Sequence, residues 1–352
     1  MESIVTSSYA VHFNETAYEL LNEHLAETSY STIFVLVDEN THKDCLPNFM
    51  SQVTFEKYEI IEIESGEENK TIDTCTGVWE ALSELDADRK SLLINLGGGV
   101  ITDLGGFVAS CFKRGIAFVN VPTSLLAMVD ASVGGKTGVD LGPLKNQIGV
   151  INQPEMVLII PSFLKTLDER QLQSGFAEML KHGLIQNKNY WEVLKLITNF
   201  DDIDDLIYDS VVIKNQVVMQ DPTEQSLRKI LNYGHTLGHA VESYFLESDN
   251  HETLLHGEAI AVGMILEAFL SHKLSGLSEE ELTDIKVTFL NRYKKVNFAT
   301  EDIKVILSLL KFDKKNSHGN INFVLLNKIG LPTIDEQIPD NLYEEAFAYY
   351  KV

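Results

Sequence analysis

The chain has 352 residues, 44% of them hydrophobic, which is more than one typical hydrophobic core holds and favours two domains with a ligand site at their junction. Its 52 acidic side chains against 28 basic ones give a formal net charge of −24, which argues against nucleic acid or an anionic membrane as a partner. The three cysteines form no C-x-x-C pair, the first residues do not resemble a signal peptide, and no run reaches the roughly 18 apolar residues of a membrane span. We therefore expect a cytoplasmic protein. If its substrate is an anion, the few basic side chains should be concentrated where that substrate binds.

Residues 1–160 alternate short β-branched segments with helical ones, as βαβ units do. Strands are predicted at residues 31–37, 55–63, 91–96 and 117–121, and a helix is predicted at 72–85. This order indicates a parallel α/β sheet.

A glycine-rich turn, NLGGGVITDLGGF, runs from Asn95 to Phe107, directly after a predicted strand and before a predicted helix. It is not a G-x-G-x-x-G fingerprint, and an ordinary strand-to-helix turn is the alternative. Such a turn needs one glycine rather than three, so we favour a dinucleotide site where backbone N–H groups approach a pyrophosphate. Asp103, one turn into the helix, is placed to face the nicotinamide ribose.

Two polar turns follow neighbouring predicted strands at the same edge of the sheet, where ligands bind in open α/β folds. They are Asp38-Glu39-Asn40 and residues 66–70 (GEENK). Asp38 is placed to accept a hydrogen bond from an adenosine ribose hydroxyl. For either turn alone, a solvated loop is the simpler interpretation.

Residues 122–149 are dense in glycine and small polar residues but contain Lys136, Lys145 and Asn146, and Arg114 lies just upstream. Ammonium groups and backbone amides together form an anion site. A flexible surface loop is the alternative, but it would expose the apolar run LLAMV at 125–129, so we predict a partly buried functional loop.

Beyond Pro161 the periodicity becomes helical, with helices predicted at residues 174–185, 204–219, 228–245 and 258–270 and a short strand or hairpin at 321–326. The second half is therefore predicted to be mostly α-helical. In a helix over 228–245, five polar residues fall on one face at offsets 0, 4, 7, 11 and 14, namely Arg228, Asn232, His235, His239 and Glu242. Because the rest of the helix is mainly apolar or glycine, this stripe should line a cleft.

Two histidines four residues apart can bind one metal, as in zincin helices, but Thr236 stands where those motifs place a glutamate. We therefore prefer one metal ligand and one acid/base group. Glu178 and His256 lie in strongly apolar segments, SGFAEMLKHG and LHGEAIAVGM.

A buried carboxylate needs a cationic partner, and a divalent metal shared by Glu178 and two histidines would provide one. Three ligands with an open position indicate a catalytic site. The alternative, an ion pair between Glu178 and Lys181, leaves the histidines unexplained.

Together these motifs resemble the 3-dehydroquinate synthase family of NAD- and metal-dependent sugar-phosphate cyclases, from about Asp38 to Gly330. The segment from Gly97 to Gly149 and the pair LNYGHTLGHAVE and LHGEAIAVGM carry the resemblance. It implies a Rossmann-like NAD domain over residues 1–160 and a mostly helical metal- and substrate-binding domain over 161–352. Pro222, Ser226, Thr102, Gly105 and Ser174 depart from the family pattern, and none of them is a proposed ligand.

The resemblance assigns zinc or cobalt to Glu178, His235 and His256. It assigns NAD contacts to Asp38, Asn40, Glu67, Lys70, Gly98, Gly99, Val100, Asp103, Thr123, Ser124, Lys145, Phe163 and Thr166. It assigns the phosphate, carboxylate and hydroxyls of the substrate to Arg114, Asp130, Lys136, Asn146, Lys181, Lys214, Arg228, Asn232 and His239, with either Lys314 or Lys315. Among these, His239, Lys136, Asn146, Lys181 and Asn232 would act in the chemistry, His239 by relaying a proton.

The implied reaction converts 3-deoxy-D-arabino-heptulosonate 7-phosphate into 3-dehydroquinate and phosphate, a step of the shikimate pathway of aromatic amino acid biosynthesis, with NAD regenerated in each turnover. A homodimer is also implied. The rivals are sister cyclases that make inosose or valiolone rings, polyol dehydrogenases of the glycerol dehydrogenase type, and a silent NAD-binding regulator. Lys214 and Asn232 disfavour the sister cyclases, and the complete polar stripe disfavours a regulator.

Overall fold

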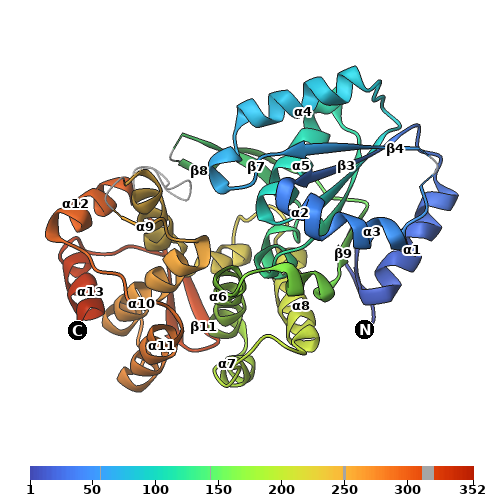
Figure 1. Cartoon of the computed structure of the whole chain (residues 1–352). Coiled ribbons are helices and arrows are strands. Elements are labelled where there is room, and N and C mark those ends of the chain that lie inside the picture. Colours follow the sequence, from blue (N-terminus) through green and yellow to red (C-terminus); the bar gives the residue numbers. More distant parts are fainter. Residues whose placement is uncertain (56, 143, 249–250, 311–320) are drawn as a thin grey trace. The chain divides into compact units, whose positions relative to one another are not determined.

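The computed structural model describes residues 1–55, 57–142, 144–248, 251–310 and 321–352 (Figure 1). The chain forms two compact units. Unit 1 comprises Met1–Gly142, Asn146–Leu172 and Asp204–Asn215, and unit 2 consists chiefly of Gln173–Ile203 and Gln216–Val352, with Lys145. The domain boundary at residue 160 stays a prediction. None of the described helices is long and apolar enough to cross a membrane.

Unit 1 is built on a seven-stranded sheet in the order β1-β2-β9-β6-β5-β3-β4. Every neighbouring pair is parallel except β1 and β2. The strands are β1 (Ile4–Val5), β2 (Ala10–Phe13), β3 (Ile33–Asp38), β4 (Tyr58–Ile63), β5 (Leu92–Gly97), β6 (Ala117–Pro122) and β9 (Met156–Ile159). The four predicted strands are confirmed as β3 to β6, and the predicted helix at 72–85 is confirmed as α4 (Ile72–Glu84).

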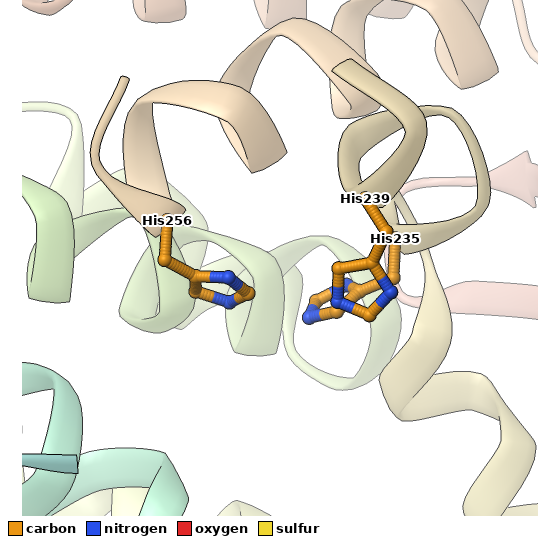
Figure 2. Close-up of side chains that lie close together, drawn as sticks. All are labelled: His235, His239 and His256. Atoms are coloured by element: carbon orange, nitrogen blue, oxygen red, sulfur yellow. The ribbon is translucent and has the colours of Figure 1, made fainter. Parts of the chain in front are cut away.

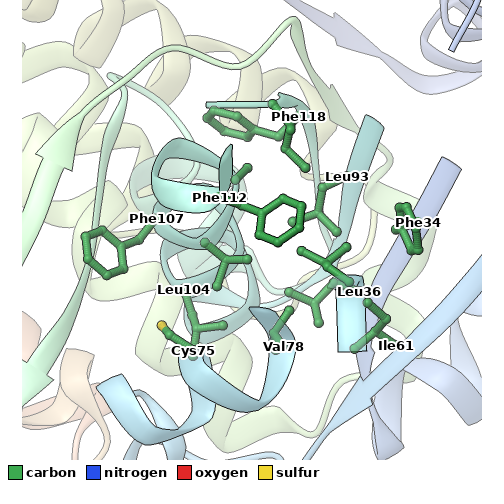
Figure 3. Close-up of a cluster of buried hydrophobic side chains, with 14 of the residues drawn as sticks. Phe34, Leu36, Ile61, Cys75, Val78, Leu93, Leu104, Phe107, Phe112 and Phe118 are labelled. Atoms are coloured by element: carbon green, nitrogen blue, oxygen red, sulfur yellow. The ribbon is translucent and has the colours of Figure 1, made fainter. Parts of the chain in front are cut away.

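The apolar core of unit 1 lies between the sheet and two helices, α4 and α5 (Gly99–Cys111), as Figure 3 shows. Alternate residues of β3, Phe34 and Leu36, face the same side and meet Val78 of α4 and Leu104 of α5. All six residues of β5 are buried, as expected for a parallel strand covered on both faces. The remaining helices of this unit's first half are α1 (Asn14–Glu27), α2 (Glu39–Asp44) and α3 (Leu46–Gln52).

The segment 122–149, predicted as a loop, contains regular secondary structure instead. It contains a π-helical turn η3 (Ala127–Ala131) and a separate two-stranded sheet of β7 (Lys136–Leu141) and β8 (Leu144–Ile151). A Cβ on Gly138 would lie 2.4 Å from the Ile148 oxygen, so glycine lets the two strands approach. Burial of Leu125, Met128 and Val129 confirms that the segment is partly buried.

Unit 2 is mostly helical, as predicted. Its helices are α6 (Glu169–Gln186, which starts within unit 1), α7 (Lys188–Leu194), α9 (His235–Glu247), α10 (His256–Leu274), α11 (Glu279–Arg292), α12 (Thr300–Leu309) and α13 (Asn341–Lys351). Helix α8 (Asp204–Gln220) runs from unit 1 into unit 2. The predicted short hairpin is confirmed as β10 (Phe323–Lys328) paired antiparallel with β11 (Leu331–Glu336).

The prediction of one continuous helix over residues 228–245 is wrong. A 3₁₀ turn, η5 (Leu227–Asn232), precedes α9. The helix is interrupted at Gly234, whose φ of 80° is left-handed. A Cβ on Gly234 would lie 2.3 Å from the Met264 side chain of α10. Contact with α10 therefore requires glycine at this position, and only His235, His239 and Glu242 of the predicted stripe share α9.

Candidate active site

The glycine turn connects the carboxyl end of β5 to the amino end of α5 in unit 1. Gly98 is the N-cap residue of α5 and offers no side chain to the first N–H groups of the helix. A Cβ on Gly97 would lie 2.5 Å from Ile101, so the turn depends on glycine there. Thr123, after β6, donates its N–H to the Gly97 oxygen at 2.9 Å and keeps Ser124 beside the turn. The helix end, free of a side-chain cap, fits a bound phosphate.

The other predicted dinucleotide residues of unit 1 lie at several positions. Asp38 ends β3, and its carboxylate accepts the Thr41 N–H at 2.8 Å as the N-cap of α2, while Asn40 is exposed. Phe163 is buried in the 3₁₀ helix η4 (Pro161–Thr166), and the Thr166 hydroxyl donates to its carbonyl. Because its side chain is buried, Phe163 can contact a ligand only through its backbone.

Lys70 is buried and contacts both Asp103, in the first turns of α5, and Asn146, a predicted substrate residue. Its Nζ donates to Asp103 Oδ2 at 2.6 Å and to Asn146 Oδ1 at 2.8 Å, with Glu67 Oε1 at 4.0 Å. Burial lowers the pKa of Lys70, but Asp103 and Glu67 outweigh it and raise the pKa above its usual value. Burial also raises the pKa of Asp103 in spite of Lys70. The Lys70 ammonium group lies 2.6 Å from the Asp103 carboxylate, and we infer that the two form an ion pair. The Asp103 side chain therefore faces Lys70.

Asn146 has a left-handed backbone (φ 51°), and its N–H donates to Asp140 Oδ1 at 2.6 Å. Elsewhere in unit 1, Lys214 donates to the Asp130 backbone oxygen at 2.5 Å and to the Asp130 carboxylate at 2.6 Å. Lys136, in β7, is half-buried.

Arg114 lies apart from the other predicted residues of unit 1. It is exposed, with φ of 72°, and precedes the amino end of β6, whereas Thr123 follows the carboxyl end of that strand. Six strand residues span roughly 20 Å. Within unit 1, Arg114 therefore sits at the opposite sheet edge from the glycine turn, and its assignment to the substrate stays a prediction.

Three helices of unit 2 bring together the predicted metal ligands. Figure 2 shows His235 and His239, one turn apart on α9, facing His256 at the start of α10. One nitrogen of each imidazole lies within 4.8 Å of the others. Glu178, on α6, is fully buried, and its Oε1 lies 3.5 Å from His235 Nε2 and 3.6 Å from His256 Nε2.

These distances fit a shared metal ion. Two ligand atoms that are each about 2.1 Å from a tetrahedral metal lie about 3.4 Å apart, close to the separations of 3.5 and 3.6 Å in this site. The Tyr233 carbonyl oxygen lies 3.0 Å from His235 Nδ1, which leaves Nε2 directed toward Glu178. A three-histidine set with His239 is a further geometrically possible site.

Lys181, only 1% exposed, forms an ion pair with Glu178 Oε2. The simple ion-pair explanation of Glu178 is thus partly right, but the other carboxylate oxygen faces two imidazoles. The carboxylate therefore has a cation on one side and nitrogen ligands on the other.

Glu242 is a functional candidate to which the sequence analysis assigned no role. Its Oε2 lies 3.1 Å from His256 Nδ1, and its Oε1 lies 3.7 Å from Lys145 Nζ. Burial raises the pKa of Glu242, but His256 outweighs it and lowers the pKa far below the usual range. Burial by itself lowers the pKa of His256, but the carboxylates of Glu242 and Glu178 outweigh burial and raise this pKa to about 10. A carboxylate on Nδ1 holds the ring with Nε2 toward a metal.

The polar turn before α9 holds two further predicted substrate residues. Asp221 accepts the backbone N–H groups of three following residues, including Arg228 at 3.0 Å. The buried Arg228 guanidinium donates to the Pro222 oxygen at 2.7 Å, and Asn232 Nδ2 donates to Glu224 Oε1 at 2.8 Å. Glu224 was missed because it lies outside any periodic segment. Lys314 and Lys315 lie outside the described residues.

The buried cations are informative in so acidic a chain. A buried ammonium or guanidinium group is unfavourable unless it is paired. Five of the predicted cationic site residues are nevertheless buried, namely Lys70, Lys145, Lys181, Lys214 and Arg228. Each of them therefore needs an anionic partner, and their assignment to an anionic substrate or to NAD stays a prediction.

Comparisons with known proteins match most of the chain. The family model described as 3-dehydroquinate synthase N-terminal matches residues 60–174, and the C-terminal one matches residues 175–316. The chain is 41% identical to the 3-dehydroquinate synthase of Parabacteroides distasonis, covering 94% of both chains. It is 37% identical to that of a Sulfurovum species, covering 95% of this chain and 96% of the other.

Two solved structures share the fold. A 2-deoxy-scyllo-inosose synthase complexed with carbaglucose-6-phosphate, NAD⁺ and Co²⁺ matches with a TM-score of 0.82 and 24% identity, covering 99% of both chains. The 2-epi-5-epi-valiolone synthase of Streptomyces hygroscopicus, with NAD⁺ and Zn²⁺ bound, matches with the same TM-score and identity, covering 100% of this chain and 99% of the other.

Proposed function

The chain belongs to the 3-dehydroquinate synthase family, and we propose that it converts 3-deoxy-D-arabino-heptulosonate 7-phosphate into 3-dehydroquinate and phosphate. This is a phosphate-eliminating carbon–oxygen lyase reaction in aromatic amino acid biosynthesis. The observation that carries the proposal is the fully buried carboxylate of Glu178, which lies between the Nε2 atoms of His235 and His256. Such a ligand set with an open position suits catalysis.

We assign NAD to the glycine turn of unit 1 and a divalent zinc or cobalt ion to Glu178, His235 and His256. The NAD⁺ and Co²⁺ or Zn²⁺ in the two related cyclase structures support both assignments. When bound, NAD supplies a reversible hydride acceptor, and the metal supplies a Lewis acid that polarises substrate hydroxyls.

The side chains of this chain have several tasks in the proposed reaction. Lysine and arginine side chains bind the phosphate and carboxylate of the substrate, and we assign this task to Lys136, Lys214 and Arg228, with Lys314 or Lys315. Arg114, which precedes the amino end of β6, is assigned to the substrate by the family resemblance alone. The amides of Asn146 and Asn232 and the carboxylate of Asp130 hold hydroxyls. His239 takes the proton of the reacting hydroxyl at one of its ring nitrogens, since it lies one turn beyond His235.

Lys181 has a separate task. Its ammonium group partly neutralises Glu178 and keeps a positive charge beside the reacting centre, where negative charge develops on oxygen. Lys145 is one of the predicted NAD residues, but its ammonium group faces the Glu242 carboxylate.

A single assay separates the proposal from its rivals. With the heptulosonate phosphate, a dehydroquinate synthase releases phosphate and accumulates no NADH. A polyol dehydrogenase produces NADH from a polyol, a sister cyclase releases phosphate only from another sugar phosphate, and a silent regulator does neither. Protein that carries metal and NAD but releases no phosphate from this substrate would refute the proposal.

We further propose a cytoplasmic homodimer with an NAD domain over residues 1–160. The family resemblance supports this arrangement. Sedimentation equilibrium at several protein concentrations measures the subunit number, and a monomer under all conditions would contradict it.

A further inference from the structure

Glu267 is a fully buried carboxylate that no step of the proposed reaction uses. It lies in the middle of α10, the helix that begins with His256. Its side chain crosses to the first turn of α9, the helix that begins with His235. There its Oε2 accepts the Gly234 N–H at 2.6 Å, and its Oε1 accepts the Leu237 N–H at 3.2 Å.

These two N–H groups are the ones that a capping box normally satisfies, at the N-cap and N3 positions of a helix. In α9 the N-cap residue is Gly234 and the N3 residue is Leu237, so neither side chain can accept a hydrogen bond. Glu267 performs both parts of the capping box from the neighbouring helix. Its negative charge also lies at the positive end of the α9 dipole.

The capped turn carries a proposed metal ligand together with the group that orients it. His235 lies between Gly234 and Leu237, and the Tyr233 carbonyl oxygen at His235 Nδ1 immediately precedes them. The Tyr233 hydroxyl donates to the Met264 oxygen of α10 at 3.1 Å. The first turn of α9 is thus held against α10 from both sides.

We propose that Glu267 is a positioning residue that sets the orientation of His235 and thereby the affinity of unit 2 for a divalent metal ion. The inference rests on the metal assignment of the proposed function. Without the carboxylate, the first turn of α9 loses two hydrogen bonds and a favourable charge, and His235 loses its fixed direction toward Glu178. Replacing groups that orient metal ligands typically weakens metal binding by about 10- to 100-fold.

The test is Glu267→Gln in the full chain, because glutamine keeps the size of the side chain and one acceptor but removes the charge. The Kd for Zn²⁺ is measured by competition with a chromophoric chelator, and the visible absorption of the Co²⁺-loaded protein reports ligand geometry. We expect the Kd to rise about tenfold, the Co²⁺ spectrum to change, and phosphate release to recover in excess metal.

Ser278→Ala is the matched control. The Ser278 hydroxyl caps α11 through the Glu281 N–H at 3.1 Å, and α11 carries none of the proposed ligands. This variant loses a helix cap in the same unit, so it should keep the wild-type Zn²⁺ affinity and Co²⁺ spectrum. If the two variants behave alike, Glu267 has only a general structural role.

The outcomes distinguish the two proposals. Wild-type protein that does not bind Zn²⁺ refutes the metal assignment itself. Wild-type binding with unchanged affinity and spectrum in Glu267→Gln overturns the role of Glu267 and leaves the metal site intact. If circular dichroism shows that Glu267→Gln does not fold, Glu267→Asp enters the same assays, and its shorter reach should also weaken Zn²⁺ binding.

Discussion

Replacement of His239 by alanine separates the two roles that three neighbouring histidines allow. The ring centroid of His239 lies 5.1 Å from that of His235 and 5.8 Å from that of His256. One ion can therefore be shared by all three rings, or two rings can hold the ion while the third carries a proton. We expect the second arrangement, because Glu178 stands at tetrahedral ligand spacing from His235 and His256.

The expected size of the effect follows from this division of roles. Removing a positioned proton carrier lowers kcat by about 10²- to 10⁴-fold. This corresponds to about 3 to 5 kcal/mol of activation free energy. The metal content should not change in His239→Ala, because Glu178, His235 and His256 keep their mutual contacts. The variant should thus retain its metal and turn over slowly.

Two measurements on the same preparation test this prediction, phosphate release at saturating substrate and elemental analysis after dialysis. His272→Ala is the matched control, since His272 lies in the last turn of α10 and its Nδ1 contacts the Leu277 oxygen at 2.8 Å. It should retain both metal and activity. Loss of metal from His239→Ala would place His239 among the ligands and refute the assignment of proton transfer to it.

Three further predictions concern the same centre. Glu178→Gln removes the buried charge that attracts the ion, so the purified variant should lose most of its metal; a full metal content would contradict the ligand assignment. Glu242→Gln removes the charge beside His256 Nδ1 and should weaken Zn²⁺ binding about 10- to 100-fold in a chelator competition, whereas unchanged affinity would exclude an orienting role. In metal-free protein, Glu242 and Glu178 raise the pKa of His256 from 6.5 to about 10. The native state then binds more protons than the unfolded state, so this contribution to stability is present below pH 6.5 and lost as the pH rises through about 10. Because the same proton must leave before a metal binds, Zn²⁺ affinity should rise over this interval, and melting curves and titrations at several pH values measure both trends.

The strands that the sequence predicted are those whose six-residue segments are rich in apolar or β-branched residues. Strands β3 to β6 each have six residues, and β3 and β5 in particular are almost wholly apolar. Strands β2 and β9 have only four residues, too few for periodicity to separate a strand from a piece of buried helix. Their place in the sheet depends on each other, since β2 pairs with β9 at the end of a long chain segment. Local sequence carries no record of that pairing.

The candidate site was predictable where burial demanded a partner. Glu178 in an apolar helix required a cation, and the structure brings Lys181 and two imidazoles to it. The polar stripe was only half right, because the spacing of Arg228 and Asn232 places them with the histidines only if the helix is continuous. Their true neighbours, such as Glu224, are set by a turn built on Asp221 that has no periodicity.

The glycines next to His235 and His256 allow close helix packing, whereas the histidines themselves are the proposed metal ligands. Gly234 precedes His235 and leaves room for Met264 of α10, while a Cβ on Gly263 would lie 2.0 Å from the Gly234 oxygen. Gly257 follows His256, and a Cβ there would lie 1.9 Å from the Ser174 oxygen of α6, one turn before Glu178. Each proposed ligand therefore lies next to a point where two helix backbones touch, and such contacts leave little freedom for the ligand's Cα. The glycines are visible in the sequence, but the backbone that each one admits becomes visible only when the three helices pack together.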